Sequence, residues 1–462
     1  MQLCKFVENC YNDSRCELVY SEKSSVRHKN KQGIAYSVFP FGSSRQIFLV
    51  GEPEEQYSCQ NDVQGQRRTV PDYPRQVRSL LENVKTVCEE QGFMENVAAM
   101  CHFFIANIGM RELVRQLAHE ICPQILGAVT FVSQAPASGA VIALELWAIS
   151  GKKSFAVCKK ILECKTLIPG IIATAQFDGM RWFFGGGFQP DTLSTGAYNR
   201  SQYALKWLGY WLRNVQWAHW GWHRTYRPDQ LLRTWIYQGH LLQPEGVTQR
   251  YKELNRARTD IFGKTKFLKQ YLPKNFKGAV YPASTGIGAD DFDVVISAVA
   301  LDTKRKDVRV VPLENPKQTS AFNYDAVYSP QSPKFSRAMA VAVKNECLIF
   351  VSGTASITDS ESQHIGDPEK QTEQTLDNIA VLIDGENLAR HGLSGIASGL
   401  ENFECVRIYI KRPSDLEVIQ QVCQRRLPGV PTIYTIADIC RPELLVEIEG
   451  VIFTVGCGSG SL

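Results

Sequence analysis

The sequence predicts an α+β fold built from three copies of one unit, and two observations predict it. First, apolar residues with strand and helix periods alternate in the order β-β-α-β-α-β-β near the N-terminus, and this order recurs near the C-terminus. Second, the landmarks agree in spacing, because Gly51 and Glu145 lie as far apart as Gly353 and Glu447. Such recurrence indicates internal repeats. We expect the copies to occupy residues 1–150, 151–328 and 329–462.

The first copy shows the unit clearly. Its opening strands are rich in β-branched and aromatic residues and are expected at Ile34–Pro40 and Ile47–Val50. Apolar residues then recur at intervals of three and four over Gln76–Gln91, which predicts a helix that ends before Gly92. The remaining expected elements are a strand, a helix and a hairpin of two strands: Val97–Ile105, Met110–Ile121, Ala128–Val132 and Ala140–Ile149.

The middle copy is less regular. Its expected elements are three strands and two helices, in the order Trp182–Gly187 (strand), Tyr203–Val215 (helix), Leu231–Tyr237 (strand), Tyr251–Phe262 (helix) and Asp293–Leu301 (strand). At the place that corresponds to Glu145 and Glu447, this copy carries Ser297.

The third copy repeats the full order. Its expected elements are Ala338–Val343 and Leu348–Val351 (strands), Gln371–Ile383 (helix), Glu404–Ile410 (strand), Ser414–Arg426 (helix), and Ile433–Ala437 and Leu444–Phe453 (strands). The match in element order makes the third copy the counterpart of the first.

The last strand of the third copy carries a candidate acid. Side chains two apart share a face of a strand, so Glu447 and Glu449 point the same way. Apolar neighbours desolvate the Glu447 carboxylate and favour its protonated form, which general acid catalysis requires. Cys440 lies just upstream and is expected to line the same pocket. The alternative is an edge strand with solvated glutamates.

Composition narrows the classes of partner. The net charge of +4 suits a small anionic substrate and is too low to favour nucleic acid. The 14 cysteines are scattered without zinc-site spacing, which indicates a reducing compartment. The most apolar long stretch, Ile125 to Ile149, contains polar residues and is not expected to span a membrane. We therefore expect a cytoplasmic protein without nucleic-acid or membrane partners.

Four stretches of the third copy resemble the RidA/YjgF family of reactive-intermediate deaminases: SGTASI, GDPEKQTEQTLDNIAVLI, VRIYIKRPSDL and LVEIEG. Members of that family form homotrimers with active sites between subunits. The resemblance implies a covalent pseudo-trimer with sites between repeats. The family's carboxylate-binding arginine, shortly after a proline, is missing from Pro431-Thr432-Ile433-Tyr434, which puts imine hydrolysis in doubt.

Three motifs in order resemble the chorismatases, enzymes with RidA-like domains that release pyruvate from chorismate: YPASTGIG at 281–288, SPKFSRA at 332–338 and ADICRPELLVEIEG at 437–450. The resemblance implies that Glu447 is the catalytic acid. It also places two pocket positions that differ between branches at Gly353 and Cys440. This pair is similar to the branch that forms 3-hydroxybenzoate, rather than the branch that hydrolyses chorismate to a dihydroxycyclohexadiene acid.

Chorismate carries two carboxylates, and arginine suits carboxylate recognition. We expect Arg258 and Arg412 to hold these groups, and Tyr328 and Ser336 to donate hydrogen bonds to the substrate. The alternative for each arginine is a surface ion pair, and for each hydroxyl a structural hydrogen bond.

The sequence thus predicts a chorismatase that converts chorismate to pyruvate and 3-hydroxybenzoate without a metal or redox cofactor. We expect a monomer or a weak homo-oligomer. Two alternatives stay open: an imine/enamine deaminase on the same scaffold, and a non-catalytic, RidA-like ligand-binding protein. The position of the hydroxyl group on the product and the role of the N-terminal repeat also stay open.

Overall fold

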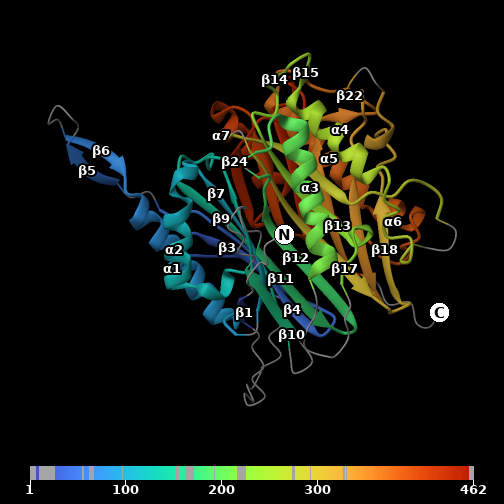
Figure 1. Cartoon of the computed structure of the whole chain (residues 1–462), viewed down its shortest axis with the longest axis horizontal. Coiled ribbons are helices and arrows are strands. Elements are labelled where there is room, and N and C mark those ends of the chain that lie inside the picture. The colour runs from blue at the N-terminus through green and yellow to red at the C-terminus, as the bar shows by residue number, and fades with distance from the viewer. Residues whose placement is uncertain are drawn as a thin grey trace.

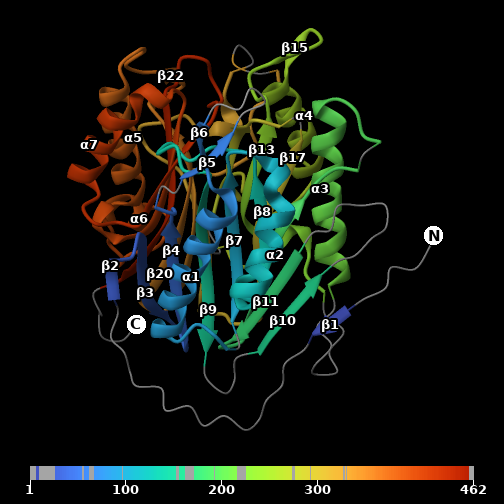
Figure 2. The ribbon, with the colours of Figure 1, turned by 90° about the vertical axis from the view of Figure 1, so that its left-hand side faces the viewer.

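A computed structural model describes residues 7–9, 26–54, 57–61, 67–95, 97–151, 156–161, 171–191, 193–215, 225–272, 276–291, 293–325, 328 and 330–456. Three large mixed sheets lie inside the molecule, and pairs of helices cover their outer faces (Figure 1). Figure 2 shows the helix pairs at separate places around the outside, with α1 and α2 facing the viewer.

The three large sheets share one strand order. The first sheet has the order β2-β3-β4-β9-β7-β8, and the third has the matching order β18-β19-β20-β25-β23-β24. The middle sheet is β10-β11-β12-β17-β13-β16 with β1 added at its edge. In each sheet the last long strand lies between two earlier strands, antiparallel to both.

The strands of the first sheet are β2 (Val26–Lys31), β3 (Ile34–Phe41), β4 (Ser44–Gly51), β7 (Ala98–Ile105), β8 (Ala128–Val132) and β9 (Ile142–Gly151). Those of the middle sheet are β1 (Val7–Asn9), β10 (Ala156–Ile161), β11 (Ile171–Phe177), β12 (Met180–Phe188), β13 (Leu231–Gly239), β16 (Ala283–Ala289) and β17 (Val294–Thr303). Those of the third sheet are β18 (Val308–Leu313), β19 (Ala338–Val343), β20 (Glu346–Ala355), β23 (Phe403–Ile410), β24 (Thr432–Ile436) and β25 (Val446–Val455).

The remaining strands form small two-stranded pairs: β5 (Tyr57–Asn61) with β6 (Arg67–Pro71), β14 (Pro244–Glu245) with β15 (Thr248–Gln249), and β21 (Ile357–Thr358) with β22 (Glu361–Ser362). The α-helices are α1 (Tyr73–Gln91), α2 (Arg111–Ile121), α3 (Ala197–Asn214), α4 (Arg250–Phe262), α5 (Pro368–Ile383), α6 (Gly385–Arg390) and α7 (Leu416–Arg426). Within the described residues, no helix is long and apolar enough to cross a bilayer.

Each sheet is buried on both faces, because one face meets helices and the other meets the neighbouring sheets. Apolar residues of β7 alternate accordingly: Cys101 and Phe103 pack with helix residues, whereas Met100 and Phe104 join a central cluster. This central cluster contains residues of all three sheets, including Trp147, Trp182 and Phe350. The centre of the molecule is therefore an apolar core shared by the three units.

Most expected elements are present, but the strand pairing differs from one expectation. The expected hairpin of β8 and β9 is wrong, since β8 pairs in parallel with β7 and β9 lies between β4 and β7. The middle sheet also contains β10, β11 and β16, which were not predicted. The strand β16 consists mainly of small residues with weak strand preference, so its pattern gave little signal.

The third sheet begins earlier in the chain than residue 329. Its edge strand β18 ends at Leu313 and pairs with β19. The proposed division at residues 328 and 329 lies next to residues outside the described set. The three-domain division stays a proposal, with β18 belonging to the third sheet.

The strand register shows which residues of the three units correspond. The corresponding pairs on the last and the preceding central strand are Glu145–His102, Ser297–Trp235 and Glu449–Arg407. These pairs meet in cyclic order across the centre: Arg407 bonds Glu145, Trp235 bonds Glu449, and His102 bonds Ser297. The expected correspondence of Glu145 and Ser297 with Glu447 is therefore wrong, because both correspond to Glu449, two positions further along the strand. Chain spacing also counts loop residues, and the third unit contains the additional helix α6.

Candidate active site

A cavity lies between the middle and third units, as the resemblance implied. Its volume is about 700 Å³ including its open mouth. The middle unit contributes the start of α4 and strand β16, while the third contributes β20, β25 and the segment before β19. The lining residues are Gln249, Tyr251, Ser284, Gly286, Tyr324, Tyr328, Pro333, Phe335, Arg337, Gly353, Ala355, Ile357, Cys440, Arg441 and Glu447.

Glu447 is the buried acid of this cavity. Its side chain projects from β25, pairs in register with Ala355, and is 5% exposed. Burial, and secondly the nearby charge of Glu449, raise the pKa of the Glu447 carboxyl group to about 8 against the opposing effect of Arg233 and Arg337. Glu447 is therefore protonated at neutral pH, as a general acid must be.

Gly353 makes room for this acid. It lies in a bulge of β20, where the register with β25 shifts between Val351 and Thr354. A β-carbon at position 353 would lie 1.9 Å from Oε1 of Glu447. A larger residue here would therefore displace the Glu447 carboxyl group from the position it has in this structure.

Two arginines give the cavity positive charge. Arg337 donates from Nη2 to the carbonyl oxygen of Thr319 at 3.0 Å, and Arg441 donates from Nη1 to that of Ser360 at 2.9 Å. Among the described residues, Nε of Arg337 and Nη2 of Arg441 are buried without a hydrogen-bond partner. Each guanidinium group thus keeps one N–H donor that no described protein atom accepts.

Aromatic rings fix these arginines and line the walls. The guanidinium carbon of Arg441 lies 4.2 Å from the centre of the Tyr328 ring, and that of Arg337 lies 5.5 Å from the centre of the Tyr324 ring. Phe335 lines the same wall. The cavity thus combines a protonated acid, two cations and aromatic walls, which suits a small, multiply anionic, cyclic molecule.

The predicted site residues divide into three groups. Glu447, Cys440, Gly353 and Tyr328 line the cavity together. Burial raises the pKa of the Cys440 thiol to about 12, so Cys440 lines the cavity as a neutral thiol at neutral pH.

Arg258 and Ser336 lie behind the wall. Arg258 is buried, donates to the carbonyl oxygen of Lys334 at 3.2 Å, and lies over the Phe335 ring. Burial lowers the pKa of Arg258 to about 10, so it stays charged. Ser336 is fully buried and is not a lining residue.

Arg412 lies outside the cavity lining. Its Nε donates to Asp415 at 2.7 Å beside the start of α7, and its side chain is 49% exposed. Arg412 therefore forms a surface ion pair, which was the alternative expected for this residue.

The sequence reasoning missed Arg337 and Arg441 as site residues. Both lie inside the recognised motifs, Arg337 next to Ser336 and Arg441 next to Cys440. The motifs therefore contained both residues. However, neither residue lies in a strand, so no alternation of inward and outward side chains indicated that it lines the cavity.

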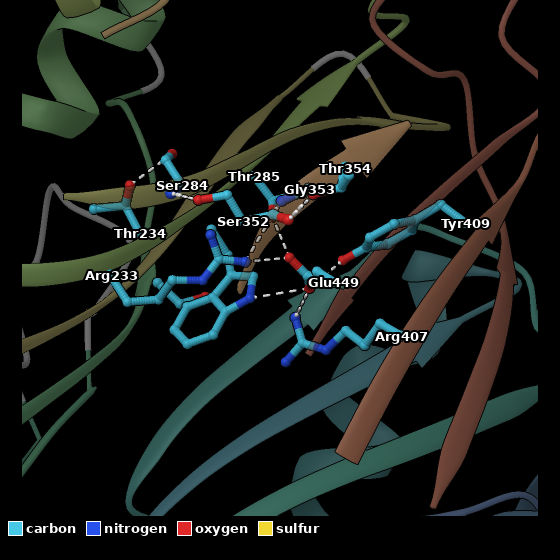
Figure 3. A network of polar contacts seen from close by, with 12 residues as sticks. Arg233, Thr234, Ser284, Thr285, Ser352, Gly353, Thr354, Arg407, Tyr409 and Glu449 are labelled. Atoms are coloured by element: carbon cyan, nitrogen blue, oxygen red, sulfur yellow. Dashed lines mark hydrogen bonds and ion pairs between the residues drawn. The ribbon is translucent and has the colours of Figure 1, made fainter. Parts of the chain in front are cut away.

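A buried polar network lies beside the cavity at the centre of the molecule (Figure 3). Glu449 accepts hydrogen bonds from Trp235 at 3.0 Å, Tyr409 at 2.8 Å and Arg407 at 3.1 Å, and it also contacts Arg233 and Thr285. Arg407 pairs in addition with Glu145. The two buried arginines and two buried glutamates balance in charge, which a low-dielectric interior requires.

No protein-family model matches this chain. A 3-hydroxybenzoate synthase from Streptomyces hygroscopicus is 32% identical over 233 residues, which is 48% of this chain and 64% of that protein. A chorismatase from Streptomyces rapamycinicus is 34% identical over 226 residues, again 48% of this chain and 64% of that protein. The chain thus matches less than two thirds of the length of these relatives.

A crystal structure of a chorismatase matches 70% of this chain and 86% of its own, with 22% identity and a TM-score of 0.54. The shared strand order, the outer helix pairs and this likeness define the class: an α+β chain of three similar units arranged as a pseudo-trimer, with the fold of that crystal structure. The predicted fold class is therefore confirmed. In its particulars, the chain is similar in sequence to a chorismatase and to a 3-hydroxybenzoate synthase.

Proposed function

We propose that this protein is a chorismatase, which releases pyruvate from chorismate in the cavity between its middle and third units. The observation that carries the proposal is a carboxyl group, Glu447, buried beside two arginines that each retain an unpaired donor. A dianionic ring compound with an acid-labile enol ether matches this arrangement. The similarity to a chorismatase and a 3-hydroxybenzoate synthase supports the same substrate.

In the proposed reaction, Arg337 and Arg441 hold the two carboxylates of chorismate, and Arg258 adds positive charge from behind the wall. Glu447 transfers its proton to the methylene carbon of the enolpyruvyl group. The carbon that carries the ether oxygen then becomes electrophilic and is attacked by a hydroxyl oxygen, after which pyruvate leaves. When the attacking oxygen is the ring's own hydroxyl, this oxygen leaves with pyruvate: its bond to the ring carbon breaks, and so does the original ether bond at the pyruvyl carbon. The hydroxyl proton passes to the ether oxygen that stays on the ring, and loss of a ring proton to Glu447 gives hydroxybenzoate and pyruvate with no net water.

We propose further that the product is 3-hydroxybenzoate. Gly353 and Cys440 line the cavity beside Glu447, so they shape the space that an attacking water would need. If an outside water attacked instead, one water would be consumed and a dihydroxycyclohexadiene acid would form.

The cavity favours this function over the two alternatives. A deaminase of the RidA type needs one carboxylate clamp, whereas two arginines line this cavity. A non-catalytic binding protein would not need a buried carboxyl group whose pKa is raised to about 8.

The test is incubation of the purified chain with chorismate, followed by chromatography of pyruvate and ring products. We expect equal amounts of pyruvate and 3-hydroxybenzoate. Formation of pyruvate with a non-aromatic diol would support chorismatase activity but contradict the assignment to the 3-hydroxybenzoate-forming branch. Unconsumed chorismate would contradict the proposed function.

A further inference from the structure

We propose that Thr285, which belongs to the middle unit, is a positioning residue for the acid Glu447 of the third unit. This inference rests on the proposed function. It is carried by the contacts of one buried hydroxyl group, which connects the bulge in β20 with the charged network at the centre (Figure 3).

The Thr285 hydroxyl group uses its full hydrogen-bonding capacity. It accepts the backbone N–H of Gly353 at 2.9 Å and an N–H of Arg233 at 2.6 Å, and it donates to Glu449. A hydroxyl group has one donor and two acceptor sites, so all are occupied. Thr285 is 1% exposed, and water does not replace these partners.

Gly353 transmits this contact to the acid. The space where a β-carbon of Gly353 would lie is bounded by Oε1 of Glu447 at 1.9 Å and by Cγ2 of Thr285 at 3.1 Å. The Thr285 hydroxyl group therefore holds the backbone of the bulge, while the Thr285 methyl group and the Glu447 carboxyl group both lie on the side of Gly353 where its side chain would be. A shift of the bulge would change both the position and the burial of the carboxyl group.

Thr285 also holds the second carboxylate. Glu449 lies two residues from Glu447 on the same face of β25, and its charge acts with burial to keep Glu447 protonated. The titratable and charged groups around Glu447 come from five elements or segments: Glu449, Arg233, Arg337, Tyr251 and Cys440. Of these, Thr285 contacts Glu449 and Arg233 directly.

The pseudo-threefold arrangement supplies a matched control. Thr130 on β8 occupies the place of Thr285 in the neighbouring interface, where its hydroxyl group accepts the backbone N–H of Gly187 at 3.1 Å and contacts Ser297 at 3.1 Å. Gly187 lies in the matching bulge of β12. The position of Glu447 is occupied there by Val295, so this hydroxyl group supports a bulge that faces no acid.

The experiment compares Thr285→Val, Thr285→Ser and Thr130→Val. Glu447 is titrated by NMR in protein carrying ¹³C-labelled glutamate carboxyl groups, with Glu447→Gln used for assignment, and kcat and KM for chorismate are measured against pH. We expect Thr285→Val to lower kcat by about 10- to 100-fold with little change in KM, and to shift both the Glu447 titration and the alkaline limb of the pH profile. We expect Thr285→Ser to keep the wild-type kcat and the wild-type Glu447 titration. We expect Thr130→Val to lower the stability without changing kcat or the Glu447 titration.

Wild-type kcat and titration in Thr285→Val would overturn the proposal, and so would an equal shift in Thr130→Val, which would indicate a general packing effect. If Thr285→Val does not fold, Thr285→Cys replaces the hydroxyl group by a weakly bonding thiol, and the same criteria apply to it. If the wild-type protein leaves chorismate unchanged, the proposed function fails, while the NMR titration still tests the positioning of Glu447.

Discussion

Glu447 loses most of its hydration because β25 places it against the bulge of β20. Glu447→Gln preserves the shape of this side chain and removes the transferable proton. We expect kcat for chorismate to fall by ~10²–10⁴-fold with an unchanged circular dichroism spectrum, since general acid catalysis contributes about this factor. Retention of kcat within a factor of about three would remove Glu447 from the mechanism.

The raised pKa of Glu447 also predicts how stability depends on pH. Its pKa is about 8 in the folded chain and has an ordinary value of 4.5, so between these values the folded state retains a proton that the unfolded state has lost. The free energy of unfolding should therefore fall as pH rises through this window, by about 1.4 kcal/mol per pH unit from this group. Denaturant unfolding measures the slope. Glu447→Gln should reduce it by this amount, while the raised pKa values of Glu314 and Glu404, each about 7, leave a slope at lower pH. An identical slope in both proteins would contradict the assigned pKa.

Gly353 gives a steric prediction. In Gly353→Ala the new methyl group would overlap the Glu447 carboxyl group, so we expect a loss of at least about 10-fold in kcat/KM, measured by pyruvate release. The control is Gly209→Ala on α3, where the nearest atom to the new β-carbon lies 3.6 Å away. Gly209→Ala should keep activity and stabilise the helix by about 0.5–1 kcal/mol. Full activity in Gly353→Ala would show that the acid has more room than the structure gives it.

At the residue scale, the sequence predicted the acid better than the cations. Glu447 was predictable because alternation along a strand and apolar neighbours determine its face and burial. Arg337 and Arg441 belong to irregular segments, where only tertiary contacts decide that they line the cavity. Arg412 follows a strand and looked similar in sequence, but its contact is Asp415.

Helix α5 forms hydrogen bonds to the backbone that follows Cys440 and Arg441. Its buried Gln371 accepts the backbone N–H of Leu445 at 2.8 Å and donates to the carbonyl oxygen of Glu443 at 3.0 Å. Gln371→Met would leave these buried backbone groups unpaired, at a cost of about 1–3 kcal/mol. We expect a lower melting temperature and a higher KM for chorismate, because the Arg441 segment loses its support.

Lys370→Ala is the matched control for this prediction. Lys370 precedes Gln371 on the same helix, but its side chain is 67% exposed and pairs only with Asp367 among the described residues. We expect a change in the free energy of unfolding within about 0.5 kcal/mol and an unchanged KM. Equal effects of the two substitutions would contradict the role of Gln371.

At the element scale, most helix ends were predicted to within three residues because the apolar periodicity is regular, but α3 begins six residues before its predicted start and α6 was not predicted. Helix α1 also carries clear caps. Asp72 and Gly92 bound α1, where Asp72 accepts the backbone N–H of Arg75 and Gly92 adopts the left-handed conformation. Strand order was less predictable. The parallel pairing of β7 with β8 joins segments on either side of a helix, and no local pattern distinguishes it from a hairpin.

The three units form similar interfaces, but the position of the acid differs among them. Glu447 in the third unit corresponds to Val295 in the middle unit and to Ala143 in the first. At the first-to-middle interface, a β-carbon on Gly186, the counterpart of Ser352, would lie 2.6 Å from the carbonyl oxygen of Val129, so the two units approach closely through their backbones. Among the described residues, the repeated architecture thus places an acid at one interface of the three.

The central network should be a major determinant of stability. Arg407 bonds Glu145 and Glu449 from two units, and all three side chains are buried. Arg407→Met removes a cation and leaves two buried carboxylates, so we expect a loss of about 3–5 kcal/mol in the free energy of unfolding. Chemical denaturation checks this value, and the double variant Arg407→Met with Glu145→Gln should recover part of it. A loss below about 1 kcal/mol would show that the network is solvated.

The origin of the proton that reaches pyruvate tests the central claim most directly. Protein equilibrated in deuterium oxide is mixed with less than one equivalent of chorismate, so that each site turns over at most once before Glu447 can reuse a proton taken from the ring. The released pyruvate is reduced at once to lactate and analysed by mass spectrometry. Proton transfer from the exchangeable carboxyl group of Glu447 predicts one deuterium in the methyl group, with loss of turnover in Glu447→Gln. Pyruvate without deuterium would mean that the proton comes directly from the ring carbon, and it would contradict general acid catalysis by Glu447.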